Sequence, residues 1–98
     1  MRVVVPVSEI RGEESPICKI TSAKAFAFLR LGEGMSVERL EFKESFENEF
    51  FDYIVVSHKN EDLETAYDLG ARALLAREGM DIEQIVEAMM FRELDEIV

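Results

Sequence analysis

The chain is poor in the residues that build most chemical sites. Its 98 residues include one cysteine, one histidine, two prolines and no tryptophan. A single cysteine excludes both an intramolecular disulfide and a CxxC metal site. One histidine and one cysteine, with no carboxylate pair that the sequence places together, leave no acid–base or nucleophile–base couple. We therefore expect a protein that is not an enzyme.

Basic residues and long apolar runs are also scarce. Eleven lysines and arginines against 21 acidic residues give a formal net charge of −10. A field of that sign repels the phosphate backbone of nucleic acids and anionic membrane surfaces. No stretch approaches the roughly eighteen apolar residues of a membrane span, and residues 1–14 become charged too soon for a signal peptide. We expect a cytoplasmic protein with neither nucleic-acid nor membrane partners.

The chain does contain enough apolar material for one core. Apolar residues make up 48% of the sequence, and a chain of this length encloses a single continuous core. We expect one domain over residues 1–98 that folds without disulfides or a structural metal.

The first half of the chain has the pattern of β-structure. The valine-rich run 2–7 predicts a strand buried on both faces in the middle of a sheet. Pro6 is expected near the end of that strand, because proline offers no N–H to the ladder. Residues 8–22 follow as a loop. Residues 25–31 and 36–43, separated by a turn with two glycines, predict an antiparallel hairpin.

Strand and helix patterns alternate from residue 52 onward. Residues 52–57 (DYIVVS) predict a second buried strand, because they are rich in β-branched and aromatic side chains. Asn60 is a suitable N-cap for a helix that Gly70 would end. Residues 71–76 then predict a short strand.

The closing helix has the strongest pattern in the chain. Asp81 is its expected N-cap, and Gln84 three residues later completes a capping box. Its apolar side chains recur at helical spacing on one face, and the helix is expected to run to about Leu94. The whole pattern predicts an α/β protein with a mixed sheet and few helices.

The order of these segments resembles that of the dinitrogenase iron–molybdenum cofactor biosynthesis family. The family's opening strand is similar to MRVVVPVS, and the strand before its helix to FDYIVVS. Its helix, glycine and strand are similar to LETAYDLGARALLA, and its closing helix to GMDIEQIVEAMMFREL. The resemblance implies a ribonuclease-H-like α/β fold, a mixed sheet of about five strands with two main helices, and it does not imply nuclease activity.

The resemblance also implies a non-catalytic accessory protein that binds or carries an iron–molybdenum cofactor, an iron–sulfur cluster or a precursor. The chain departs from the family in two places. The first loop has Ile17, Cys18 and Lys19 where the family commonly has a His-Phe-Gly segment, and residues 44–51 lack its glycine-rich stretch and helix. A second interpretation therefore stays open: a protein-interaction or regulatory module of the same fold that has lost the cofactor.

The resemblance implies that strands 2–7 and 52–57 are parallel neighbours, so the loops after them would meet at one edge of the sheet. The cofactor-binding candidates at that edge are Cys18, His58 and Met80, and the metal ligands among them are Cys18 and His58. Thiolate, imidazole and thioether all bind iron. Each residue also has a plainer interpretation: a small apolar residue, a solvated turn residue and a hydrophobic staple, respectively.

Charge and aromatic residues bear on the partners. The acidic residues near the start of the first helix would receive a cation better than an anionic cluster. Because residues 44–51 lack the family's helix, part of one sheet face is expected to be uncovered. Phe46, Phe50 and Phe51 either cover it from within the chain or leave an apolar patch for a homodimer or another protein partner.

Overall fold

The computed structural model describes residues 1–97 and contains a six-stranded mixed sheet with two α-helices. The strand order is β3-β2-β1-β4-β5-β6. The expected mixed α/β architecture is confirmed, with six strands rather than about five. The elements are β1 (Arg2–Val7), η1 (Ile20–Ser22), β2 (Ala25–Leu31), η2 (Glu33–Met35), β3 (Val37–Lys43), β4 (Tyr53–Val56), α1 (Glu64–Asp68), β5 (Arg72–Leu75), α2 (Ile82–Met90) and β6 (Asp95–Ile97).

The valine-rich strand β1 lies in the middle of the sheet, as predicted. It pairs antiparallel with β2 along its whole length and parallel with β4 at Val3 and Val4. Val3 and Val4 belong to the cores on opposite faces of the sheet, and both are essentially fully buried. Pro6 lies opposite Phe26 of β2, beyond the last residue that pairs with β4. The parallel pairing of the first strand with the DYIVVS strand is therefore confirmed.

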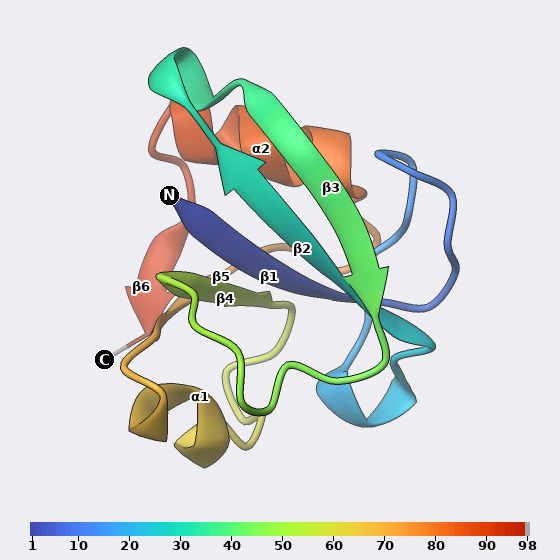
Figure 1. Ribbon diagram of the computed structural model, residues 1–98, viewed down its shortest axis with the longest axis vertical. Coiled ribbons are helices and arrows are strands. Elements are labelled where there is room, and N and C mark those ends of the chain that lie inside the picture. Colours follow the sequence, from blue (N-terminus) through green and yellow to red (C-terminus); the bar gives the residue numbers. More distant parts are fainter. Residues whose placement is uncertain (98) are drawn as a thin grey trace.

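The two faces of the sheet are covered in different ways (Figure 1). Helix α2 lies behind β2 and β3 in this view and packs its apolar face, including Ile82 and Ile85, on one core. The other core is closed by the short helix α1 and by the connection between β3 and β4. The second cover is thinner because the connection, residues 44–52, contains no helix.

Phenylalanines of that connection supply part of the missing cover from within the chain. Phe46 packs edge-on against Phe26, with ring centroids 5.1 Å apart, and Phe51 packs edge-on against Phe28 at 6.3 Å. Phe50 instead points outward and is 78% exposed. Two of the three rings therefore belong to the core, which reduces the apolar surface available to a partner. A homodimer or a hetero-complex stays a prediction.

The first helix is shorter than predicted, and the choice of Asn60 as its N-cap is wrong. The helix begins at Glu64, whose N–H donates to the Asp62 carboxylate at 3.1 Å. Glu61 also stays outside the helix. Its carboxylate accepts the backbone N–H of Ile20 in the first loop at 2.8 Å. Side chains thus hold residues 57–63 as a loop. Gly70 ends the helix as predicted, with a φ of +86°.

The closing helix also ends earlier than predicted, at Met90 rather than about Leu94. Arg92 adopts a left-handed φ of +56°, and its N–H and that of the next residue donate back into the last turn. This hydrogen-bond pattern is a Schellman end made without glycine. The freed residues form β6, an edge strand that pairs antiparallel with β5 and that the sequence pattern did not predict.

The start of α2 is fully hydrogen-bonded. Asp81 accepts the N–H of Gln84 at 2.8 Å, and the Gln84 side chain accepts the N–H of Asp81 at 3.0 Å, so the predicted capping box is confirmed. Carbonyls of Glu13 and Ser15 in the first loop accept the next two free N–H groups of the helix. With nine residues α2 is the longer helix, and within residues 1–97 no helix is long and apolar enough to cross a membrane.

We expect Asp81→Ala to lower the free energy of unfolding by about 1–2 kcal/mol, because it removes the cap and leaves a helix N–H without its partner. Urea denaturation followed by circular dichroism measures the loss. Glu87→Ala, on the exposed face of the same helix, should change stability by no more than about 0.5 kcal/mol. Equal losses in both variants would contradict a specific capping role for Asp81.

Candidate functional site

The loops that follow the three parallel strands are tied together at one edge of the sheet. Strands β1, β4 and β5 run in the same direction, so their carboxyl ends lie at that edge. The N–H of Ile17 donates to the carbonyl of Met80 at 2.8 Å, which joins the first loop to the third. The Ile20–Glu61 bond joins the first loop to the second. We call these three loops, residues 8–22, 57–63 and 76–81, the binding rim.

Cys18 contributes a thiol to the binding rim. Its N–H donates to the carbonyl of Pro6 at 3.0 Å, which fixes the backbone beside the end of β1. The side chain is partly exposed, with Sγ 3.3 Å from the Lys19 carbonyl oxygen. Burial raises the pKa of the Cys18 thiol, and the nearby Glu61 carboxylate raises it further. The thiol is therefore mostly protonated near neutral pH and must lose its proton to bind a metal.

His58 contributes an imidazole to the same rim, and both of its nitrogens have partners. Nδ1 lies 3.0 Å from Oγ of Ser57, and Nε2 lies 3.3 Å from a carboxylate oxygen of Glu78 in the third loop. The Glu78 side chain is 77% exposed. Replacing this exposed contact by a metal would cost little, because surface ion pairs contribute about 1 kcal/mol or less.

Met80 lies in the core rather than at the surface of the rim. It is only 6% exposed and packs in the same cluster as Ile85. Its sulfur lies 3.3 Å from the backbone nitrogen of Arg77, whose N–H it accepts. The position directly before the N-cap Asp81 is that of a hydrophobic staple. The geometry favours this structural role for Met80 over the role of a ligand.

Two side chains of the rim are the candidate metal ligands, Cys18 and His58. Within residues 1–97, no group of three or more His, Cys, Asp or Glu side chains is arranged to hold a metal ion. Cys18 and His58 come from different loops, and the structure brings those loops to one edge. The rim therefore contains a thiol and an imidazole.

Sequence reasoning missed a second feature, a cavity on the sheet face opposite α2. It has a volume of about 340 Å³, and four of its lining residues are Arg2, Arg30, Arg39 and Lys43. The signal was the alternation of residues along the hairpin, which places Arg30 and Arg39 on the same face. The pairing register decides this, however, and it shifts directly after Arg30, so the sequence alone did not establish it.

Comparison with known proteins gives a fold likeness without a sequence match. No protein-family model and no curated protein sequence matches the chain. The crystal structure of PH0822 matches with a TM-score of 0.79 and 18% identity over 98% of this chain and 96% of that one. A candidate dinitrogenase of Methanocaldococcus jannaschii (MJ0327) matches with a TM-score of 0.74 and 18% identity, over 99% and 94% of the two chains.

A third solved structure extends the same likeness. A candidate NifB protein from Thermotoga (TM1290), of the DUF35 family, matches with a TM-score of 0.71 and 17% identity. The match covers 97% of this chain and 91% of that one. At such low identities a likeness establishes the fold and leaves the function of the chain open. This protein has the same fold as PH0822, MJ0327 and TM1290, over nearly the whole length of each chain.

Proposed function

We propose that this protein is a non-catalytic accessory protein of the dinitrogenase iron–molybdenum cofactor type, and that it carries a metal cluster or its precursor as cargo. Two of the structural neighbours bear nitrogenase-related names, a candidate dinitrogenase and a candidate NifB protein. An antiparallel hairpin beside parallel strands β1, β4 and β5 also supports the ribonuclease-H-like assignment. The proposal extends the shared fold to a shared class of function.

The observation that carries the proposal is the binding rim. Cys18 and His58 are the side chains in the rim best suited to iron, and their loops are joined through Glu61 and Ile20. A carrier has to release its cargo, and two protein ligands hold a cluster less firmly than a closed set of four. The remaining coordination positions of the cargo would be filled by its own small ligands and, at transfer, by the recipient.

The charge of the rim defines the kind of cargo that it would accept. Glu61 and Glu78 lie beside Cys18 and His58, and Asp62 and Glu64 follow in the second loop and the start of α1. The chain as a whole carries a formal charge of −10. This field favours ferrous iron or a cationic precursor over an anionic finished cluster.

Anaerobic reconstitution tests the proposal. The purified protein is incubated with ferrous iron and sulfide and desalted, and its iron content and visible absorption are measured. We expect uptake by the unaltered protein, and a loss of at least tenfold in Cys18→Ser and in His58→Asn. Met90→Leu removes an exposed sulfur on α2 and serves as the matched control, with uptake unchanged.

The pH dependence gives an independent check, since the Cys18 pKa is raised. Uptake should increase as the pH rises, because binding displaces the thiol proton, and the increase should lie above the range of an ordinary cysteine. Cys18→Ser should abolish this increase. A folded, colourless and metal-free protein at every pH would contradict cargo binding at the rim.

An interaction or regulatory module is the second candidate function. It is favoured by the partners that the His58 nitrogens and the Met80 sulfur already have within the protein. In this case the rim is a structural junction between three loops. Failure of reconstitution together with a loss of stability in His58→Asn would support this alternative.

A further inference from the structure

Three arginines lie in a row across the uncovered part of the sheet. Arg2 of β1 is directly opposite Arg30 of β2, and Arg30 is directly opposite Arg39 of β3. Directly opposed residues share a face of the sheet, and like charges in such positions destabilise it. The side chains of Arg30 and Arg39 are 60% and 66% exposed. The three opposed arginines therefore create a local positive charge that lowers the stability of the sheet.

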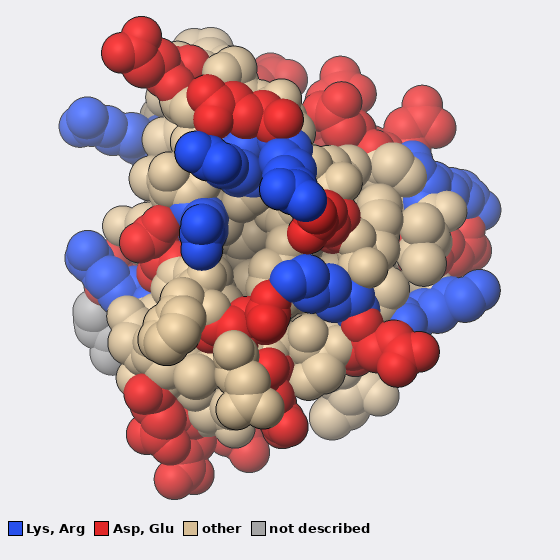
Figure 2. Space-filling model, in the orientation of Figure 1, with Lys and Arg blue, Asp and Glu red and all other residues tan. Residues whose placement is uncertain are grey.

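Carboxylates offset this charge only in part. Arg39 pairs with Glu41, and Arg30 lies 3.6 Å from Glu38. Arg2 belongs to no ion pair found among residues 1–97. Figure 2 shows lysine and arginine side chains around a hollow near the centre of this face, with some acidic side chains directly beside them and others farther out. This face of an otherwise acidic protein therefore gathers cationic side chains around one hollow.

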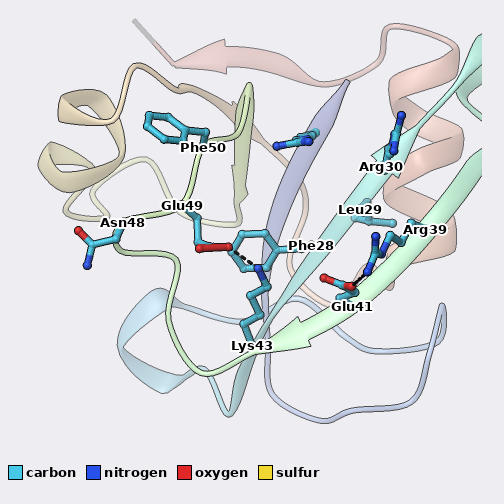
Figure 3. A pocket seen from close by; sticks show the side chains of 10 residues that line it. Phe28, Leu29, Arg30, Arg39, Glu41, Lys43, Asn48, Glu49 and Phe50 are labelled. Carbon is cyan, nitrogen blue, oxygen red and sulfur yellow. Dashed lines mark hydrogen bonds and ion pairs between the residues drawn. The ribbon is translucent and has the colours of Figure 1, made fainter.

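The arginine row borders the cavity of about 340 Å³ (Figure 3). Lys43 adds a fourth cation, positioned 4.7 Å from the ring centroid of Phe28 and paired with Glu49. Four cationic side chains thus line the cavity against two carboxylates. Phe50, which is 78% exposed, stands at the other side of the cavity. The lining combines a cationic wall with an accessible aromatic ring.

We propose that this cavity binds a small organic phosphate that carries a planar ring, such as a nucleoside monophosphate. Guanidinium groups bind phosphate oxygens through paired hydrogen bonds, which suits Arg30 and Arg39. The exposed ring of Phe50 provides a stacking surface for the planar part of the ligand. The volume lies in the range of about 300–1,000 Å³ that small-molecule sites occupy. Bound phosphate would also relieve the repulsion within the row.

This site is separate from the proposed cargo site. Arg2 begins β1, whereas the binding rim follows Val7 at the opposite end of the same strand. Ligand binding at the cavity and metal uptake at the rim are therefore measured independently. A regulatory nucleotide is one use that an accessory protein would have for such a site, and the binding test does not depend on the proposed function.

Calorimetric titration with adenosine monophosphate at low salt tests the proposal, with inorganic phosphate and adenosine as separate arms. We expect the monophosphate to bind more tightly than either part alone. Arg30→Gln and Arg39→Gln should each weaken binding about tenfold, which corresponds to about 1.4 kcal/mol. Phe50→Ala should weaken binding of the monophosphate and leave that of inorganic phosphate unchanged.

Arg11→Gln is the matched control, because it removes the same charge from an exposed side chain that pairs with Glu9 in the first loop. Its affinity should equal that of the unaltered protein. The arginine variants should stay folded, since each removes a like-charge contact, and thermal unfolding checks this. Absence of binding in the unaltered protein overturns the proposal, as does an equal loss in the control. Tighter binding of a short glutamate peptide overturns it in favour of an acidic protein partner.

Discussion

Replacing Phe46 by alanine should lower the free energy of unfolding by about 3–5 kcal/mol, the cost of removing a large buried ring. Phe46 is 8% exposed and lies between two other rings, 5.1 Å from Phe26 and 5.9 Å from Phe51. Each aromatic contact adds about 0.5–1.5 kcal/mol beyond the burial of area. Because small domains unfold at a cost of about 5–15 kcal/mol, this variant should lose a large share of its stability.

Phe50→Ala is the internal control for Phe46→Ala. Both residues lie in the same helix-free connection, but Phe50 is 78% exposed, so its removal should change stability by no more than about 0.5 kcal/mol. Urea unfolding followed by circular dichroism compares the two variants. Similar losses in both would show that residues 44–52 do not close the sheet face as described. The same Phe50 variant serves in the ligand titration, because its fold should be intact.

Met80→Ala is expected to lower the free energy of unfolding by about 2–5 kcal/mol, and Met80→Leu by less than about 1.5 kcal/mol. The reason is that Met80 is buried and fills the core beside the start of α2. Leucine restores most of the volume without the sulfur that accepts the Arg77 N–H. Thermal or urea unfolding measures both changes.

The Met80 pair also separates packing from metal binding. If Met80 acts only in the core, Met80→Leu should take up iron as the unaltered protein does. A leucine variant that is stable but has lost iron uptake would make the thioether a ligand and contradict its structural role. Measuring uptake and unfolding on the same preparation makes this distinction direct.

The sequence predicted the centre of the sheet better than its ends. Val3 and Val4 are apolar residues on opposite faces of the strand, a pattern typical of a central strand. Both are buried, as that prediction requires. The sequence predicts too late an end for the closing helix, because the residues after Met90 continue a helical composition. The stop depends on Arg92 adopting a left-handed φ, a conformation that side chains other than glycine rarely adopt. Strand β6 was missed for the same reason.

The candidate site was predictable as a meeting of loops and less so as a set of contacts. Parallel pairing of β1 with β4 follows from the resemblance, and it brings the loops of Cys18 and His58 to one edge. The contacts that Cys18 and His58 make depend on side chains from distant segments. Glu78 pairs with His58 across two loops, and Glu61 adds to the rise in the pKa of Cys18 that burial causes. Sequence spacing carries no information on such pairs.

The cationic cavity illustrates a feature that composition conceals. A net charge of −10 predicts no affinity for phosphates when it is treated as uniform over the surface. The register of two strand pairings nevertheless collects Arg2, Arg30 and Arg39 in one row. The local electrostatic potential depends on the nearest charges, because exposed charges farther away than about 10 Å are largely screened at moderate salt. The arrangement of charges therefore matters more here than their sum.

Residue-resolved NMR of the nitrogen-15-labelled protein, with ferrous iron added without oxygen, locates metal binding most directly. Iron at the binding rim should broaden the amide signals next to Cys18 and His58, and leave those of Arg30 and Arg39, on the cavity side, unchanged. Cys18→Ser should remove the selective broadening. Uniform weak broadening over the acidic surface, or selective broadening that excludes the first and second loops, would contradict a metal-carrying rim after the parallel strands.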